Sequence, residues 1–271
     1  PHMHTTVGEI VKELISKLET TADEECVFYQ WLDEHISNAS SAHVPQHVQC
    51  DSMTHLLRSF AANSLYSLFF KDICNVIWHF DEGEIEANSL NAESKRLKYL
   101  INDFISHDNE HWEMYINDWS CLGLDGTDKH FSDLLAYLFS DFTLASRKAV
   151  YHTVRIDAKL NGDVQPEHRY VIIALLEHMS SQQLFPRLGI LYDLYSTNCS
   201  VHCDLQYVSL SHCEAETNHI DISQYFDPIV IDKENARLLR EYGDEFQRIM
   251  INLFNTFYTY QLNHFDSIPL W

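Results

Sequence analysis

Apolar side chains recur every three or four residues along most of this chain, the spacing that places them on one face of an α-helix. Alternation of apolar and polar residues, which is typical of a half-buried strand, is nearly absent. We therefore predict an all-α, single-domain multi-helix bundle over residues 4–271. The stripe nearest the N-terminus shows the pattern: Val7, Ile10, Val11, Leu14 and Leu18.

Breaks in this periodicity give the expected helix ends. There are only 7 Gly and 6 Pro in 271 residues, which favours long helices. Pro166 suits the first position of a helix, and Gly123 suits a position just past a helix end. Residues 221–232 read as a loop with a short extended piece, and Pro1-His2-Met3 reads as a remnant of cloning. The predicted helices cover 6–36 (one or two helices), 52–80, 92–119, 128–140, 144–160, 166–182, 184–197, 203–220 and 233–262.

The net charge and the cysteine content limit the partners and the cellular location that we expect. The formal net charge is −22, from 18 Lys+Arg against 40 Asp+Glu, so the surface repels polyanions and we expect no nucleic acid and no membrane partner. No apolar run reaches the roughly 18 residues that a transmembrane helix needs. The 7 cysteines form an odd set without a Cys-x-x-Cys pair. We therefore expect no disulfide framework and a cytoplasmic location.

One stretch carries ionisable groups on an apolar stripe. In "LQYVSLSHCEAETNH", residues 205–219, the residues His212, Glu216 and His219 follow one another at offsets of four and three. Those offsets place all three on one face of a predicted helix over 203–220, together with Leu205 and Val208. Metal binding is one reason to bury such groups, and an exposed helix face is the alternative.

Two more helices place polar groups on predicted inward faces. Asp108 and His111 lie one turn apart within the apolar stripe of the helix over about 97–119. Glu177 lies within "VIIALLEH" on the helix over 166–182, and no cation is near it in sequence. A buried carboxylate is costly unless it is protonated, paired or bound to a metal. A single core histidine, or a glutamate that pairs with a distant arginine, would explain each residue separately.

Together these positions supply three carboxylates and three imidazoles. Such ligands suit iron, manganese or zinc. A lone zinc ion normally takes three or four protein ligands, so six ligands with carboxylates that can bridge fit two metals better. We expect two ferrous ions, with manganese as the alternative. The predicted metal ligands are Asp108, His111, Glu177, His212, Glu216 and His219.

The ordered set resembles the haem-oxygenase-like di-iron oxidases and oxygenases, which share the fold of haem oxygenase and the TenA proteins. The third element, His-x-x-x-Glu-x-x-His, matches the family pattern in full, and the run "HDNEHWEMYINDWSCLGLDG" is similar to that of iron-containing redox proteins of this group. The resemblance covers roughly residues 50–262. The family more often has glutamate where this chain has Asp108, and His107 and Glu110 are the neighbours that could replace it as a ligand.

The resemblance implies a haem-oxygenase-like bundle and a non-haem di-iron enzyme that activates O2. Its substrate would be a small organic molecule such as an amino acid, an amine or a fatty-acid-like compound. Glu177 would be the catalytic residue that bridges the metals. Trp112, Tyr115 and Tyr207 would wall the substrate pocket, although ordinary core packing also explains these aromatic residues.

Two other classes of function stay open at this point. One is a non-catalytic interaction protein that keeps the fold with a structural or vestigial metal site. The other is a mononuclear metal hydrolase. A basic stripe at Lys148, Arg155 and Lys159 could hold a substrate carboxylate or could be a solvated helix face. A homodimer is the default assembly for such a domain.

Overall fold

The computed structural model confirms the all-α fold class for the part of the chain that it describes. Helices make up most of that part. The structure describes residues 4–39, 43–58, 60–61, 79–88, 91–106, 111–124, 130–160, 162–199, 204–209 and 221–264.

The described elements follow the predicted order of helices closely. Residues 46–58 and 60–61 are also helical, within the region predicted as a helix over 52–80. The longer helices are α1 (Val7–Glu25), α2 (Val27–Ala39), α5 (Ala92–Ser106), α6 (His111–Cys121), α8 (Leu144–Val154), α9 (Pro166–His178), α10 (Phe185–Asn198) and α13 (Lys233–His264). The shorter elements are β1 (Thr5–Thr6), α4 (Glu82–Asn88), α7 (Phe131–Leu138), η1 (Asp141–Thr143), η2 (Ile156–Leu160), η3 (Met179–Leu184), α12 (Ser223–Phe226) and β2 (Val230–Ile231).

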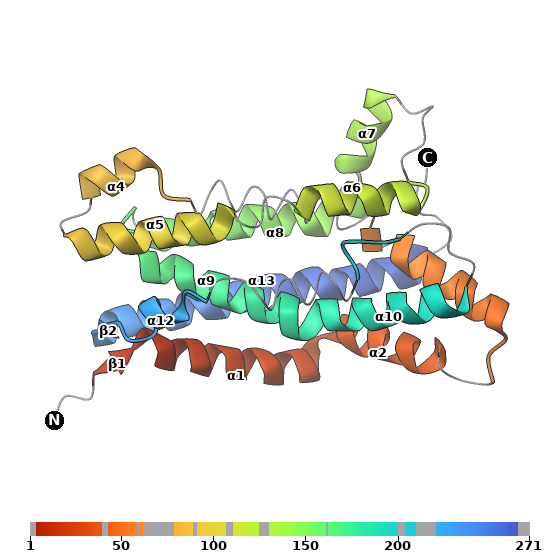
Figure 1. The fold of residues 1–271 in the computed structure, drawn as a ribbon, viewed down its shortest axis with the longest axis horizontal. Helices are drawn as coiled ribbons and strands as arrows, with labels where there is room; N and C mark the ends of the chain where they lie inside the picture. The colour runs from red at the N-terminus through yellow and green to blue at the C-terminus, as the bar shows by residue number, and fades with distance from the viewer. Residues whose placement is uncertain are drawn as a thin grey trace.

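The long helices run along the long axis of the molecule (Figure 1). Helix α1 lies at one side, α9, α10 and α13 cross the middle, and α5 and α6 lie on the opposite side. Helix α13 packs against α1, α8, α9 and α2, and is therefore the central helix of the bundle. Helix α7 projects from the body.

Helix α1 is fixed at its start and along its length. Thr6 and Glu9 form a capping box, in which each side chain accepts a hydrogen bond from the other residue's backbone N–H. Thr6 also belongs to β1, which pairs antiparallel with β2 just before α13. Farther along, Gly243 of α13 lets Leu14 approach closely, because a Cβ at that position would lie 2.5 Å from Leu14 Cδ1. These contacts bring the two ends of the chain's helical core together.

Helices α9 and α10 form one continuous helical run. The sequence predicts a break near residue 183, but residues Met179–Leu184 form a π-helical segment, η3, that joins the two helices. Ser181 Oγ donates a hydrogen bond to the backbone oxygen of Glu177, 2.7 Å away, just where the α-helical pattern changes. Pro166 begins α9 as predicted, after a turn in which Gly162 has a φ of 81°. Segments of π-helix are rare and occur often at functional sites.

Residues 92–106 and 111–119 are helical, as predicted for the helix over 92–119, and form parts of α5 and α6; residues 107–110 lie outside the described residues. The structure corrects the boundaries of two other predicted helices. The helix over 144–160 is divided into α8 and the 3₁₀ segment η2. Residues 204–209 form bends and turns, so the prediction that the helix of the third motif begins at 203 was wrong.

The structure also contradicts the expectation of no disulfide framework. Cys50 and Cys199 form a disulfide with an S–S distance of 2.10 Å. Cys121 is also disulfide-bonded. Disulfides persist mainly in oxidising surroundings, so the cysteine set no longer supports a cytoplasmic location. Of the described cysteines, Cys26 is a free thiol, and burial raises its pKa to about 11.

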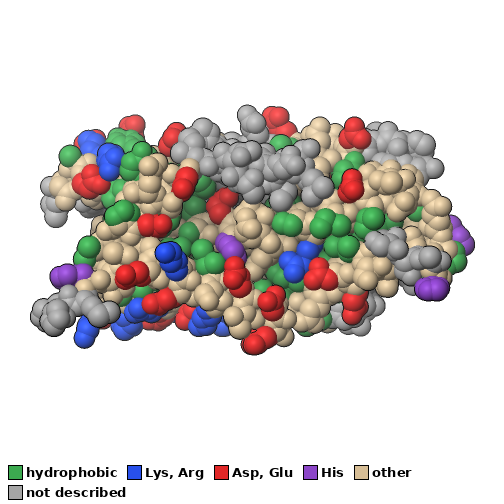
Figure 2. Space-filling model, turned by 60° about the horizontal axis from the view of Figure 1, so that its bottom comes forward, with side chains coloured by type: hydrophobic (Ala, Val, Ile, Leu, Met, Phe, Trp, Pro, Cys, Tyr) green, Lys and Arg blue, Asp and Glu red, His purple; other side chains and the backbone are tan. Residues whose placement is uncertain are grey.

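Acidic side chains spread along the face shown in Figure 2, with fewer basic side chains between them. Several of the basic residues form ion pairs between α1 and α13: Lys17 with Asp244 and Arg240 with Glu13, each at 2.8 Å. These pairs are exposed and contribute at most about 1 kcal/mol each. None of the helices in the described residues has the length and hydropathy to cross a bilayer.

Stability is expected to fall on acidification because of His168 at the start of α9. Its ring is 3% exposed, and its Nδ1 accepts a hydrogen bond from the backbone N–H of Gln165 at 2.9 Å. Its Nε2 is buried and has no hydrogen-bond partner in the described chain. Burial lowers the pKa of His168 from 6.5 to about 4. The unfolded chain therefore binds a proton between these values that the folded chain does not, so unfolding is favoured as the pH falls.

Between pH 7 and pH 5 this histidine should remove about 2 kcal/mol from the free energy of unfolding. Urea denaturation of the parent and of His168→Asn at both pH values measures the effect, because asparagine can keep the hydrogen bond to Gln165 and does not titrate. His130→Asn, at an exposed site, is the control. An equal pH dependence in the parent and in His168→Asn would contradict this account.

Candidate functional site

One face of α6 carries the first part of the candidate site. His111, Tyr115 and Asp118 follow at offsets of four and three, so they lie along the same side of the helix. They are 5%, 2% and 2% exposed, respectively. The prediction that His111 lies on an inward face is therefore confirmed.

Asp118 fixes the chain segment that precedes the third motif. Its Oδ1 accepts a hydrogen bond from the backbone N–H of Gln206 at 2.6 Å, and its Oδ2 accepts from Tyr207 at 3.0 Å and Val208 at 3.3 Å. Burial raises the pKa of this carboxyl, while the hydrogen bond from Gln206 acts in the opposite direction. The adjacent Asn117 donates a hydrogen bond to the backbone oxygen of Asp204 at 2.9 Å. The end of α6 thus holds residues 204–208 in place.

Tyr207 contacts both α6 and the start of α10. Its ring packs edge-on against Tyr115, with 5.5 Å between centroids, and against Phe185 at the start of α10, at 5.1 Å. The His111 ring lies 6.4 Å from Tyr207. The imidazole of His111 therefore borders a closed aromatic cluster, here defined as Tyr115, Phe185 and Tyr207.

Tyr115 is also anchored at its hydroxyl. The hydroxyl donates a hydrogen bond to the backbone oxygen of Ala61, and the indole N–H of Trp119 donates to the same oxygen at 3.1 Å. Burial raises the pKa of Tyr115 well above its ordinary value, so the phenol stays protonated. Tyr115 can exclude water, but it is not available as a proton donor to a substrate.

Glu177 lies in the last turn of α9 and is half-buried. It is eight residues before Phe185 on the same helical run, about two turns away. The following residue, His178, pairs with Glu19 of α1 at 3.2 Å, and burial lowers its pKa. The structure thus places Glu177 on the helical run that supports the aromatic cluster.

The remaining predicted ligands lie outside the described residues. Asp108 and its alternatives His107 and Glu110 fall in 107–110, while His212, Glu216 and His219 fall in 210–220. Trp112 belongs to α6, but the structure does not describe its side chain. Within the described ranges, no three His, Cys, Asp or Glu side chains form a group that could hold a metal ion. Only His111 and Glu177 of the six predicted ligands are described.

The basic stripe predicted along 148–159 is divided by the fold. Lys159 Nζ pairs with Glu245 at 2.5 Å and with Glu241 at 3.4 Å. The Arg155 guanidinium lies 5.2 Å from the ring centroid of Tyr151. Lys148 lines a groove between α8 and α13. The three residues therefore do not form one binding surface.

Sequence reasoning missed the role of Asp118. The residue is visible in the sequence as a carboxylate seven positions after His111, on the same helical face. Such a position signals a buried carboxylate, but its backbone partners are 88 to 90 residues away and leave no local pattern. Comparison with known protein families and with curated protein sequences gave no match to this chain.

Proposed function

We propose that this chain is a non-haem di-iron enzyme of haem-oxygenase-like architecture that activates O2 and oxidises a small organic molecule. The observation that carries the proposal is the burial of His111 beside Tyr207, in a segment that Asp118 ties to α6. Residues 210–220, which hold the third motif, follow this segment directly. A histidine of the first motif thus lies near Tyr207, which is five residues before His212 in the sequence.

The donor set fits iron. Asp108 and His111 would be ligands from the first helix, Glu177 would bridge, and His212, Glu216 and His219 would complete the set, with manganese as the alternative metal. When bound, two ferrous ions supply electrons to O2 and orient it beside the substrate. The chain itself contributes the aromatic cluster, which excludes water from the side of the site where His111 lies.

Two other functions compete with this proposal. A mononuclear metal hydrolase would hold one metal tightly and would not react with O2. A non-catalytic interaction protein would need no metal, and its acidic surface would serve a partner. A homodimer is compatible with all three.

Anoxic reconstitution with ferrous iron tests the proposal. The parent should bind about two iron ions per chain, measured by elemental analysis after desalting, and should change its visible absorption on exposure to O2. The variants His111→Ala, Glu177→Ala and His212→Ala should each lose at least one iron ion, because each removes a ligand. His130→Ala, at an exposed site, is the matched control and should bind iron as the parent does.

Thermal unfolding followed by circular dichroism shows whether each variant is folded before its iron content is compared. Iron binding that is equal in all four variants would contradict the predicted ligands. One tightly bound metal without an O2 reaction would favour the hydrolase, and no bound metal would favour the interaction protein.

A further inference from the structure

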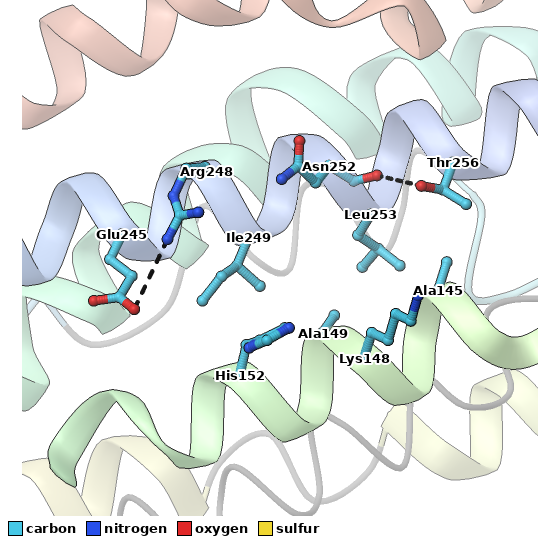
Figure 3. A pocket seen from close by; sticks show the side chains of 10 residues that line it. All are labelled: Ala145, Lys148, Ala149, His152, Glu245, Arg248, Ile249, Asn252, Leu253 and Thr256. Atoms are coloured by element: carbon cyan, nitrogen blue, oxygen red, sulfur yellow. Dashed lines mark hydrogen bonds and ion pairs between the residues drawn. The ribbon is translucent and has the colours of Figure 1, made fainter.

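A groove of about 200 Å³ runs between α8 and α13, apart from the candidate metal ligands. Figure 3 shows Ile249 and Leu253 pointing from α13 toward α8. Helix α8 presents Ala145 and Ala149 there, one turn apart, and these small side chains leave space between the helices. Because Ala149, Ile249 and Leu253 are buried, the floor of the groove is apolar.

The rim of this groove carries basic side chains. Lys148 and His152 line it from α8, and Arg248 lines it from α13 (Figure 3). No carboxylate of the described chain pairs with Lys148. The carboxylate that lines the groove, Glu245, lies 2.5 Å from Lys159 Nζ and 3.9 Å from Arg248 Nη2. A lysine that no carboxylate of the described residues pairs with is unusual in a chain whose formal net charge is −22.

A second, larger groove differs from the first in the charges of its lining residues. It has a volume of about 480 Å³ and lies along α1, η2 and α13. Its basic side chains are matched by at least as many acidic ones, so it offers no net attraction to an anion. The charged residues that line it are Lys17, Glu25, Lys159, Glu241, Asp244, Glu245 and Arg248.

We propose that the groove between α8 and α13 binds a small amphiphilic carboxylate. The carboxylate would lie against Lys148, and a short hydrocarbon body would cover Ile249 and Leu253. Charge-assisted hydrogen bonds hold the anionic end, and burial of apolar surface holds the body. The volume is below the roughly 300–1,000 Å³ of sites for drug-sized ligands, so the occupant is short. This site does not depend on the proposed iron chemistry.

Titration calorimetry with octanoate at low ionic strength tests the proposal. The parent should bind one octanoate per chain, and octanol, which lacks the charge, should bind at least about tenfold more weakly. Lys148→Gln should weaken octanoate binding by about tenfold or more. Arg155→Gln is the matched control, because Arg155 follows α8 directly but does not line the groove.

Thermal unfolding confirms that each variant is folded before the titrations are compared. Absence of octanoate binding by the parent would overturn the proposal. Equal affinity for octanol, or an affinity for octanoate that is unchanged in Lys148→Gln, would overturn it as well.

Discussion

Replacement of both Cys50 and Cys199 by serine is expected to lower the free energy of unfolding by about 4 to 5 kcal/mol. The disulfide closes a loop with a sequence separation of 149 residues, and in the chain-entropy model so long a loop gives a large stabilisation. Serine has nearly the size of cysteine, so little packing is lost. A loss of this size is a substantial part of the 5 to 15 kcal/mol that is typical of a folded domain.

Chemical denaturation under non-reducing conditions measures this loss. The disulfide of Cys121 stays intact in the double variant, so the difference from the parent reports the Cys50–Cys199 bond alone. Alkylation followed by mass spectrometry verifies the pairing in the parent, where Cys26 should be alkylated only after unfolding. A double variant as stable as the parent, or a Cys50 that is alkylated in the folded parent, would refute this expectation.

Asp118→Ala is expected to lower the free energy of unfolding by roughly 3 to 5 kcal/mol. The change leaves three backbone N–H groups without their acceptor, and those of Tyr207 and Val208 belong to buried residues. A buried donor that loses its partner costs about 1 to 3 kcal/mol. Asp118→Asn should cost less than Asp118→Ala, because the amide oxygen can still accept one or two of these hydrogen bonds.

Denaturation of both variants tests this order, with Glu113→Gln, an exposed carboxylate on the same helix, as the matched control. The aromatic cluster gives a second measurement. Release of residues 204–208 from α6 should expose Tyr207 and weaken ferrous-iron binding, while the helix content measured by circular dichroism is largely kept. If Asp118→Ala is as stable as Glu113→Gln, these hydrogen bonds do not hold the segment.

The Asp118 and disulfide contacts connect the stability of the fold with the candidate site. The disulfide joins the helical residues 46–58 to the end of α10. In the same region Thr54 Oγ1 lies 3.4 Å from the hydroxyl of Tyr195. Residues 206–208, a few positions after Cys199, are held against α6 by Asp118. Cys199 and residues 206–208, which precede the third motif in the sequence, are therefore each tied to a helix.

Local periodicity predicted most of the helices and the inward position of His111. Each apolar stripe depends on residues three or four positions apart, and that information lies within one helix. The same reasoning failed for Leu205 and Val208. Both side chains are buried, but they belong to a non-helical segment. An offset of three residues fits both conformations, so spacing alone could not distinguish them.

The sequence by itself determined the all-α class, the helix start at Pro166, and the helical face that carries His111 and Tyr115. Only the tertiary structure decided that Cys50 pairs with Cys199, that Asp118 binds the backbone of 206–208, and that Lys148 faces a groove while Lys159 is paired. Each of these contacts joins residues that are far apart in the chain. Helix periodicity records which side of a helix is buried, whereas the partner on that side is fixed only when the helices pack.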